Sequence, residues 1–491
     1  MLGLKRMSEG AVSSIGETYE ARSFFAAEWT AKTDRRALRE PFENAVVSQV
    51  HDCGAEDLDR ALDGVVAGAA RVAAMPAMER SAILHRAAVL LKERAELISM
   101  ALTRETGKTI RDSRQELARA TDVFRFCAEE AIRIEGRHLP IAGSPAGSDK
   151  VAFGLRYPVG VVAGIVPFNA PVNLACHKIG PAFAAGNSIV VKAPPQAAYT
   201  LSLVVEACLD AGLPADAIAL LHGDGALGAA LVRDHRVDFL SFTGSSRAGL
   251  AIKAAAGMRG TILELGGVGP TIVHEDADVQ LVAALCANSG FRLAGQSCAS
   301  LQNLFVHKDA LDAFTGLFLE KVRALTSGDP RDTATDVGPV IDEAAASRIE
   351  SWLAEAKAGG AKILLGGGRR GNVIEPTVVT ATTPEMKVVC DEVFGPVVVI
   401  RPYEDIGSVF QWIRDTGLGL NCGIFTGRHD VAFRAVREVP CAAIIVNGTS
   451  TFRPDQIPYG GLRNSGYGRE SPRDTIMAMT QERILVFPDA R

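Results

Sequence analysis

Residues 161–192 read VVAGIVPFNAPVNLACHKIGPAFAAGNSIVVK and contain the pattern on which the fold depends. The apolar runs Val161–Val166 and Ser188–Lys192 are typical of buried strands, and Leu174–Ala185 between them is typical of a helix. The same alternation continues as far as Phe242. Buried strands that alternate with helices form a parallel sheet, so the pattern predicts an α/β fold of the doubly wound type.

Helices are predicted before this region, and a second α/β series after it. Apolar residues recur at helical spacing over 55–134. Strand-like and helix-like segments alternate again over 261–446, and a strand-like segment lies near the end at 483–487. A chain of 491 residues is too long for one small core, so more than one domain is expected.

Composition and charge argue against several classes of protein. The net charge of −5 gives no reason to expect nucleic acid or an anionic membrane as a partner. The longest apolar stretch, near 159–168, is broken by glycines and a proline and is shorter than the roughly 18 residues of a membrane helix. The nine cysteines include no CxxC pair, which argues against a disulfide framework and a thiolate zinc site. We expect a cytoplasmic protein with no metal.

Three glycine-rich turns are candidates for binding a dinucleotide. The segment 366–371 matches GxGxxG, but no helix is predicted after it, so we interpret it as a loop. The segment 223–228 lies between a predicted strand and a predicted helix, as the fingerprint requires, yet a plain strand–helix turn explains it equally well. The turn at 242–249 also joins a strand to a helix, where free N–H groups could hold a phosphate.

One cysteine lies in a turn of small residues. The segment 295–300 reads GQSCAS, follows a predicted helix and precedes a predicted strand. Glycine and small polar neighbours leave the sulfur of Cys298 accessible and let N–H groups face whatever it attacks. Such a thiol becomes a nucleophile if its pKa is lowered or a base lies near. A packed loop cysteine is the alternative.

Further motifs occur in a fixed order with this turn: VPFN at 166–169, Lys192 at the end of the next strand, LELGG at 263–267 and EVFGP at 392–396. Together with GQSC at 295–298, they resemble the NAD(P)-dependent aldehyde dehydrogenase superfamily from about residue 55 to 487. The resemblance implies two doubly wound parallel-sheet domains and a small bridging sheet. The implied parts are a dinucleotide-binding domain (1–149 and 158–264), a catalytic domain (265–446), a bridging segment (150–157 and 470–491) and a substrate-tunnel loop (447–469).

The resemblance also implies the catalytic roles. Cys298 is the expected nucleophile towards an aldehyde, and the side-chain amide of Asn169 is expected to stabilise the oxyanion. Glu264 matches the general base that activates water, and its presence favours hydrolysis over acyl transfer to coenzyme A. Lys178 and Glu470 match positions linked to proton relay, with a structural ion pair as the equal alternative.

The cofactor implied by the family is NAD or NADP, with NAD as the usual choice. Lys192 is expected to meet the adenosine ribose or its 2′-phosphate, and Ser245 the pyrophosphate. Glu392 and Phe394 are expected to hold the nicotinamide ribose and flank its ring. Pro195 stands where NAD-preferring members often carry a glutamate, which leaves room for NADP. The other expected cofactor contacts are Ile165, Pro167, Phe168, Gly225, Gly244 and Leu265.

The substrate is expected to be a small polar or anionic aldehyde. The segment 447–461, with Arg453, is similar to the branch that handles lactaldehyde, glyceraldehyde 3-phosphate and phosphonoacetaldehyde. Arg453 could receive an anionic or hydroxylated tail, or could instead pair with Asp455 or another carboxylate to fix its loop. Leu301-Gln302-Asn303 departs from the family pattern after the cysteine. The other expected substrate contacts are His177, Arg125, Arg292 and Phe452.

The resemblance implies a homodimer or a homotetramer. Two alternatives to a hydrolytic dehydrogenase remain on the sequence alone. One is an acyl-transferring or reductive semialdehyde dehydrogenase, and the other is a non-catalytic structural or binding protein with the same fold.

Overall fold

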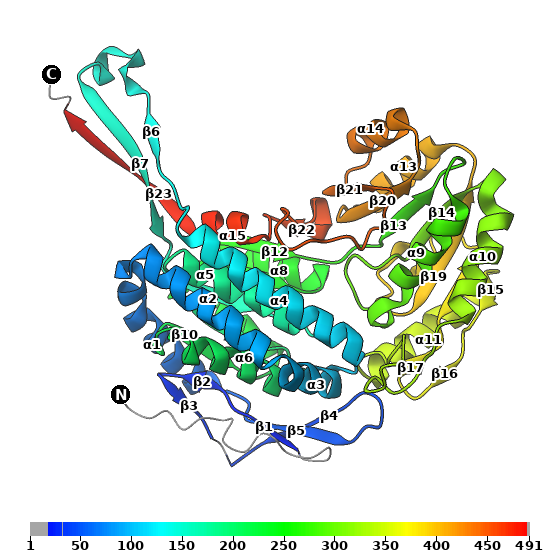
Figure 1. The fold of residues 1–491 in the computed structure, drawn as a ribbon, viewed down its shortest axis with the longest axis horizontal. Coiled ribbons are helices and arrows are strands. Elements are labelled where there is room, and N and C mark those ends of the chain that lie inside the picture. Colours follow the sequence, from blue (N-terminus) through cyan, green and yellow to red (C-terminus); the bar gives the residue numbers. More distant parts are fainter. Residues whose placement is uncertain (1–17, 32, 489–491) are drawn as a thin grey trace.

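The computed structural model describes residues 18–31 and 33–488, and the predicted alternation from residue 161 onward forms its first large sheet (Figure 1). Strands β8 to β12 are parallel, while β22 and the β2–β3 hairpin add antiparallel edges. In spatial order the strands are β22 (Gly466–Tyr467), β12 (Gly260–Glu264), β11 (Phe239–Thr243), β8 (Val161–Ile165), β9 (Ser188–Lys192), β10 (Ile218–Leu221), β2 (Phe24–Phe25) and β3 (Glu28–Trp29).

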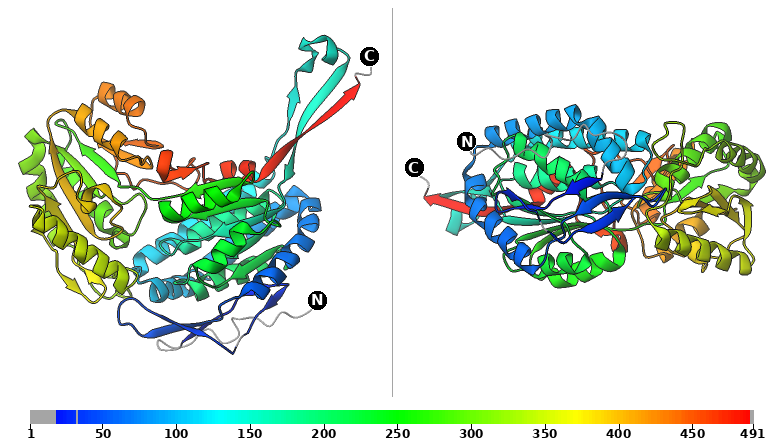
Figure 2. Two further views of the ribbon diagram at one scale, coloured as in Figure 1. Left: turned by 180° about the vertical axis from the view of Figure 1, so that it is seen from behind. Right: turned by 90° about the horizontal axis from the view of Figure 1, so that it is seen from below.

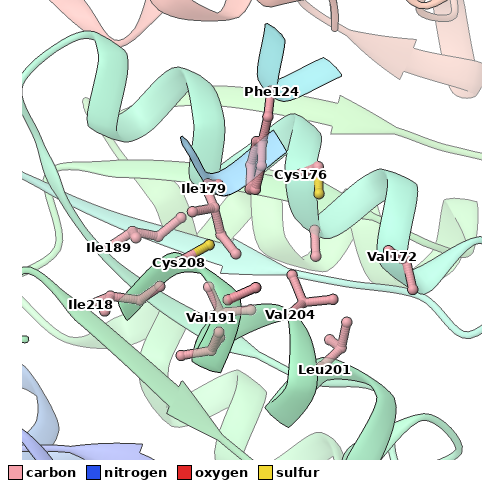
Figure 3. Packing of buried hydrophobic residues seen from close by; sticks show 14 of the residues in the cluster. Phe124, Val172, Cys176, Ile179, Ile189, Val191, Leu201, Val204, Cys208 and Ile218 are labelled. Atoms are coloured by element: carbon pink, nitrogen blue, oxygen red, sulfur yellow. The ribbon is translucent and has the colours of Figure 1, made fainter. Parts of the chain in front are cut away.

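Helices cover both faces of this sheet. On one face α5 and α6 pack on the strands and are covered in turn by α2 to α4, while α1 and α7 pack on the other face. Figure 3 shows Ile179 of α5 and Val204 of α6 meeting Val191 of β9 in the first of these layers. The helices are α1 (Ala55–Ala74), α2 (Ala77–Glu93), α3 (Ala95–Thr106), α4 (Ile110–Ala131), α5 (Pro171–Ala184), α6 (Ala198–Asp210), α7 (Gly225–Arg233) and α8 (Ser246–Ala256).

The second large sheet is built from the later α/β series. Its strands are parallel except for β15 at one edge, and α9 to α11 pack on one face with α13 and α14 on the other. In spatial order the strands are β15 (Lys362–Leu365), β18 (Thr377–Thr380), β19 (Val397–Tyr403), β14 (Asn303–His307), β13 (Pro270–Val273), β20 (Asn421–Phe425) and β21 (Ala443–Val446). The helices are α9 (Val279–Phe291), α10 (Leu311–Arg323), α11 (Glu343–Ala358), α12 (Lys387–Cys390), α13 (Ile406–Asp415) and α14 (His429–Glu438).

A narrow antiparallel arm leaves the body of the molecule (Figures 1 and 2). Its strands are β6 (Arg137–Leu139), β7 (Lys150–Pro158) and β23 (Thr480–Pro488), and β23 pairs with β7 along its whole length. The short helix α15 (Pro472–Ala478) leads into the arm. The two parallel sheets and this small sheet confirm the predicted fold class.

Two regions are more ordered than the sequence patterns indicated. The lead-in before α1 contains β1 (Tyr19–Ala21), β4 (Arg36–Arg39) and β5 (Val46–Val50), which form a small sheet of their own. The glycine-rich loop at 366–371 leads into the hairpin of β16 (Arg369–Arg370) and β17 (Val373–Ile374). No single helix among the described residues is long and apolar enough to cross a bilayer; α1 and α2 satisfy that criterion only jointly, across a bend of 116°.

The strand order of the first sheet determines where a ligand can bind. Strand β8 lies between β9 on one side and β11 on the other, so the chain reverses its winding direction there. In open α/β sheets, ligands bind beyond the carboxyl ends of the strands at this point. Asn169 follows β8, Lys192 ends β9, Ser245 follows β11 and Glu264 ends β12. The fold therefore brings four of the predicted site residues to one edge.

Candidate active site

A cavity of about 1000 Å³ lies between the two large sheets and is lined by strand ends of the first sheet and by loops and helices beside the second. Its lining includes the predicted nucleophile, base and oxyanion donor, namely Cys298, Glu264 and Asn169. Most of the other predicted residues also line it: Ile165, Pro167, Phe168, Lys192, Gly244, Ser245, Leu265, Arg292, Glu392, Phe394 and Arg453. Residues that are far apart in the chain therefore meet around one space.

The turn that carries Cys298 has an unusual backbone. After α9 ends, Leu293 and Ala294 take left-handed conformations, and Gly295 has φ of +70°. A Cβ on Gly295 would lie 1.9 Å from the carbonyl oxygen of Gly395, so only glycine fits this close approach. The contact holds the cysteine turn against the segment that contains Glu392 and Phe394.

The surroundings of Cys298 include groups that raise the pKa of its thiol and groups that lower it. Burial raises the pKa of its thiol to about 11, and the carboxylates of Glu392 and Glu264 also raise it. Two groups act in the opposite direction: the hydroxyl of Tyr459, 3.3 Å from Sγ, and the positive charge of Arg453. Formation of the thiolate depends on such favourable contacts.

The amide of Asn169 is oriented toward the same turn. Its Nδ2 donates a hydrogen bond of 3.1 Å to the backbone oxygen of Gln296. A side-chain amide has two N–H donors, so one of them remains for a ligand. Gln296 is fixed in turn because its own side chain accepts from the N–H of Ile341 and donates to the oxygen of Leu293.

Glu264 ends β12 with its carboxylate buried in the cavity wall. Its exposed fraction is 2%, and neither oxygen has a hydrogen-bond partner among the described residues. Burial first, and then the charge of Glu470, raises the pKa of Glu264 well above its ordinary value. A carboxylate with a raised pKa is a stronger base at neutral pH. Gly460 allows it this position, since a Cβ there would lie 2.6 Å from Oε1.

Behind the base lies a buried row of charges. Lys178 Nζ lies 3.1 Å from Glu470 Oε2, and Arg453 Nη2 lies 2.8 Å from Glu470 Oε1. Burial alone would raise the pKa of Glu470, but the cationic groups of Lys178, His177 and Arg453 outweigh it and lower that pKa to about 2. Lys178 and Glu470 do not line the cavity themselves. Glu470 thus stays ionised and acts on Glu264 through its charge.

A second ion pair holds the loop that carries Arg453. Arg119 of α4 makes two hydrogen bonds, of 2.9 and 2.7 Å, to the carboxylate of Asp455. His177 Nε2 lies 3.0 Å from the same carboxylate, and Asn173 donates to it at 3.1 Å. Asp455 is therefore already satisfied, which leaves Arg453 to pair with Glu470.

Several residues predicted to bind substrate or cofactor lie outside the cavity lining. Arg125 is on the exposed face of α4 and pairs with Asp122 and Glu129. His177 is fully buried against Asp455; burial lowers its pKa, and the hydrogen bond to Asp455 opposes that change. The side chain of Phe452 is 58% exposed, and Gly225 begins α7.

The cofactor end of the cavity combines one cation with a helix N-terminus. Burial lowers the pKa of Lys192 to about 8 although Asp224 and Asp52 oppose the change. Ser245 caps α8 by accepting from the N–H of Ala248. A buried cation beside free N–H groups at the start of a helix suits the phosphates of a dinucleotide.

At the other end of the cavity, Glu392 and Phe394 lie near the cysteine turn. Burial raises the pKa of Glu392 to about 7, and the hydrogen bond from the N–H of Gly267 opposes this rise. The ring of Phe394 meets that of Phe168 edge-on with centroids 5.8 Å apart. A Cβ on Gly266 would come within 2.4 Å of the Glu392 carboxylate, so glycine makes room for it. The residues present therefore fit a nicotinamide dinucleotide that spans the cavity.

The lining residues that received no role from the sequence include Arg119, Tyr459 and Trp352. Arg119 and Trp352 belong to helices, where periodicity predicts a face but not what the face meets. Tyr459 lies in the predicted substrate-tunnel segment. The sequence signal that could have identified it is a tyrosine directly before two glycines, Gly460 and Gly461.

Comparisons with known proteins agree with this geometry. Residues 29–485 match the model of the aldehyde dehydrogenase family. The chain is 39% identical to the 3-sulfolactaldehyde dehydrogenase of Priestia aryabhattai, over 97% of this chain and all of that protein. It is 35% identical to the sulfoacetaldehyde dehydrogenase of Neptuniibacter caesariensis, over 92% and 99% of the two chains. The NADP complex of NADP-dependent glyceraldehyde-3-phosphate dehydrogenase from Bacillus halodurans superimposes with a TM-score of 0.94, at 33% identity, over 96% of this chain and 100% of that one.

Proposed function

The chain belongs to the aldehyde dehydrogenase family, and on that premise we propose that it oxidises a small anionic aldehyde to the carboxylate, with Cys298 as the nucleophile. Activity as an NAD(P)-dependent aldehyde dehydrogenase follows from the family itself. The observation that carries the finer proposal is the meeting of Cys298, Glu264, Asn169 and Arg453 around one cavity.

In the first half of the proposed reaction, the thiolate of Cys298 attacks the aldehyde carbon. The carbonyl π electrons move to oxygen, which gives a thiohemiacetal. The free N–H of the Asn169 amide and the backbone N–H of Cys298 donate to this oxyanion. A nicotinamide held by Glu392 and Phe394 would supply the hydride acceptor, and loss of hydride from that carbon would leave a thioester on Cys298.

In the second half, Glu264 acts as general base. It takes a proton from water while the water oxygen bonds to the acyl carbon. The carbon–sulfur bond then breaks, its electron pair returns to sulfur, and the carboxylate product leaves. We propose that Lys178 and Glu470 assist proton transfer at Glu264 through their charges: ionised Glu470 raises the pKa of Glu264, and Lys178 lowers it.

The tail of the aldehyde is proposed to bind at Arg453. The Nε of Arg453 is buried and has no hydrogen-bond partner among the described residues. A buried donor without a partner costs free energy that a sulfonate, carboxylate or phosphate oxygen would recover. Arg292 and Arg119 also line the cavity, where each is already paired with a carboxylate, Asp112 and Asp455 respectively. The relatives named for sulfolactaldehyde and sulfoacetaldehyde support a sulfonated substrate.

We infer that the enzyme accepts NADP as well as NAD. Around Lys192 the cavity is lined by Pro194, Pro195, Gln196, Ser245 and Arg247, none of which is acidic. A 2′-phosphate would therefore meet the positive charge of Lys192 and no carboxylate of the cavity lining, while Asp224 and Asp52 act on Lys192 from outside that lining. The family alone favours NAD. This chain has Pro195 in place of the glutamate that would support that preference.

The arm is proposed to form a homodimer interface. Phe153, Ile484, Val486 and Phe487 leave about four- to six-tenths of their side-chain surfaces exposed on it. A patch of this kind is typical of a protein–protein interface. Ile484→Glu should convert a dimer, or a tetramer built from dimers, to smaller species in sedimentation velocity.

We also propose that the domain division follows the limits given above, with β22 of the 447–469 segment completing the first sheet.

The proposed function is tested by the formation of reduced nicotinamide with a panel of neutral, hydroxylated, sulfonated and phosphorylated aldehydes. Turnover with Cys298→Ser should fall to background, while Cys390→Ser, also a partly exposed cysteine but outside the cavity, should keep wild-type turnover. Wild-type turnover by Cys298→Ser would refute the mechanism. The product must be the free acid; an acyl-coenzyme A product would favour the acyl-transfer alternative. A preference for unbranched neutral aldehydes would refute the role of Arg453.

A further inference from the structure

The side chain of Tyr459 contacts the proposed nucleophile. Its hydroxyl oxygen lies 3.3 Å from Cys298 Sγ, and this is the hydrogen bond that the sulfur makes to a side chain among the described residues. The ring is almost fully buried and forms part of the cavity wall.

The position of this hydroxyl is fixed by its surroundings. The N–H of Tyr459 donates to the oxygen of Glu470 at 3.1 Å, and the N–H of Glu470 donates back at 2.7 Å. The guanidinium of Arg453 lies 3.8 Å from the ring centroid, and Arg453 itself is held by Glu470. The backbone and the ring face of Tyr459 are therefore both anchored to the buried charges, so the hydroxyl has little freedom to leave the sulfur.

The thiol of Cys298 needs such a neighbour. Burial raises its pKa to about 11, and the nearby carboxylates add to this effect. The Tyr459 hydroxyl and Arg453 are the groups that oppose it. Burial also raises the pKa of the Tyr459 phenol well above its ordinary value, so the phenol keeps its proton and remains a donor.

We propose that Tyr459 is a catalytic residue whose O–H donates a hydrogen bond to Cys298 Sγ and stabilises the thiolate that attacks the aldehyde. The inference rests on the proposed function only in taking Cys298 as the nucleophile. The same donor acts again when water cleaves the thioester, because the electron pair of the broken carbon–sulfur bond returns to this sulfur.

The reverse direction of the hydrogen bond gives the opposite prediction. If the phenol oxygen instead accepted a hydrogen bond from the thiol S–H, it would stabilise the protonated form of Cys298 and raise its pKa. Removal of the hydroxyl would then make the thiol more acidic. The sign of the change in Tyr459→Phe therefore distinguishes a donor to the thiolate from an acceptor for the thiol.

The experiment measures alkylation of Cys298 by iodoacetamide as a function of pH, with the modified peptide quantified by mass spectrometry. A hydrogen bond to a charged group is strong enough that Tyr459→Phe should raise the pKa of the thiol by about one pH unit. Alkylation near neutral pH should then be about tenfold slower, with equal rates once both thiols are ionised. The matched control is Tyr403→Phe, which removes a buried hydroxyl bonded to His274 outside the cavity and should change nothing.

An unchanged or lowered pKa in Tyr459→Phe would overturn the proposal. Replacement of Tyr459 by 3-fluorotyrosine keeps the ring and makes the hydroxyl a stronger donor, so it should lower the thiol pKa even if Tyr459→Phe folds poorly. Alkylation needs no substrate. If the wild-type enzyme oxidised no aldehyde, the proposed function would fail while the result on Tyr459 would stand.

Discussion

Replacing Gln302 with alanine should weaken cofactor binding although Gln302 touches no part of the cavity. Its side chain is buried just before β14 and bonds three backbone groups of the segment around Glu392. Nε2 donates to the oxygens of Val388 and Asp391 at 3.1 and 2.7 Å, and Oε1 accepts from the N–H of Val393 at 3.0 Å. Glu392 is thus tied down on both sides by one amide.

The magnitude follows from the groups left without partners. A buried polar group that loses its hydrogen bond costs about 1–3 kcal/mol. Gln302→Ala leaves three such groups without this partner: the oxygens of Val388 and Asp391 and the N–H of Val393. Water entering the space of the lost amide recovers part of this, so we expect about 3 kcal/mol of local destabilisation. Conformations with Glu392 displaced become populated, and the apparent Kd rises as the competent fraction falls. We expect about a tenfold increase, or about 1.4 kcal/mol.

The assay is a titration with NAD+ and NADP+ followed by the fluorescence of Trp352, which lines the cavity. Gln302→Glu keeps the acceptor and loses the donors, so its Kd should fall between those of the wild type and Gln302→Ala. The control is Gln411→Ala on the exposed side of α13, which should bind as the wild type does. A Gln302→Ala variant with both the wild-type Kd and the wild-type unfolding midpoint would refute the reasoning.

Other replacements separate the remaining roles. Glu264→Gln should give a rapid burst of reduced nicotinamide and then little turnover, because the thioester is no longer hydrolysed; a steady rate equal to the wild type would contradict this. Burial raises the pKa of Glu264 in the folded state above its pKa in the unfolded chain. The folded state therefore loses stability as pH rises above the unfolded-state pKa. Because glutamine does not ionise, Glu264→Gln should raise the unfolding midpoint more at about pH 8 than at about pH 5. Arg292→Ala should raise KM for anionic aldehydes by about tenfold, whereas Arg125→Ala, a variant of the exposed ion pairs, should leave KM unchanged. Lys192→Met should lower kcat/KM for NADP+ by about tenfold and for NAD+ by less, and equal losses would argue against a 2′-phosphate contact.

The parts of the site that could be predicted from the sequence are those set by strand ends. Asn169, Lys192 and Glu264 each follow a buried apolar run, and parallel strands bring such positions to one edge of a sheet. Gly295 of the cysteine turn and Gly244 were equally visible because they mark tight backbone turns. The roles expected of these residues came from the resemblance to the family, while the strand ends explain why the residues meet at one edge.

The remaining residues depend on contacts between distant segments. Arg119 meets Asp455 across most of the chain, and no local pattern marks either residue as a partner of the other. Arg125 was the arginine of α4 expected at the substrate, but it lies more than one turn from Arg119 and points to solvent. Gln302 looked like a change in the tunnel, yet its side chain faces away from the cavity toward the segment 388–393.

The close approach of Gly295 to Gly395 has a consequence for how enzymes of this shape can diversify. There is no space for even a methyl group between the two backbones, so Cys298 and the segment proposed to hold the nicotinamide ribose can change only together. Of the side chains proposed to choose the aldehyde, Arg119 and Arg453 come from α4 and from the segment 447–469, while Arg292 lies beside the cysteine turn. Changes in α4 and in the segment 447–469 can therefore alter the substrate without changing the cysteine turn or the segment packed against it.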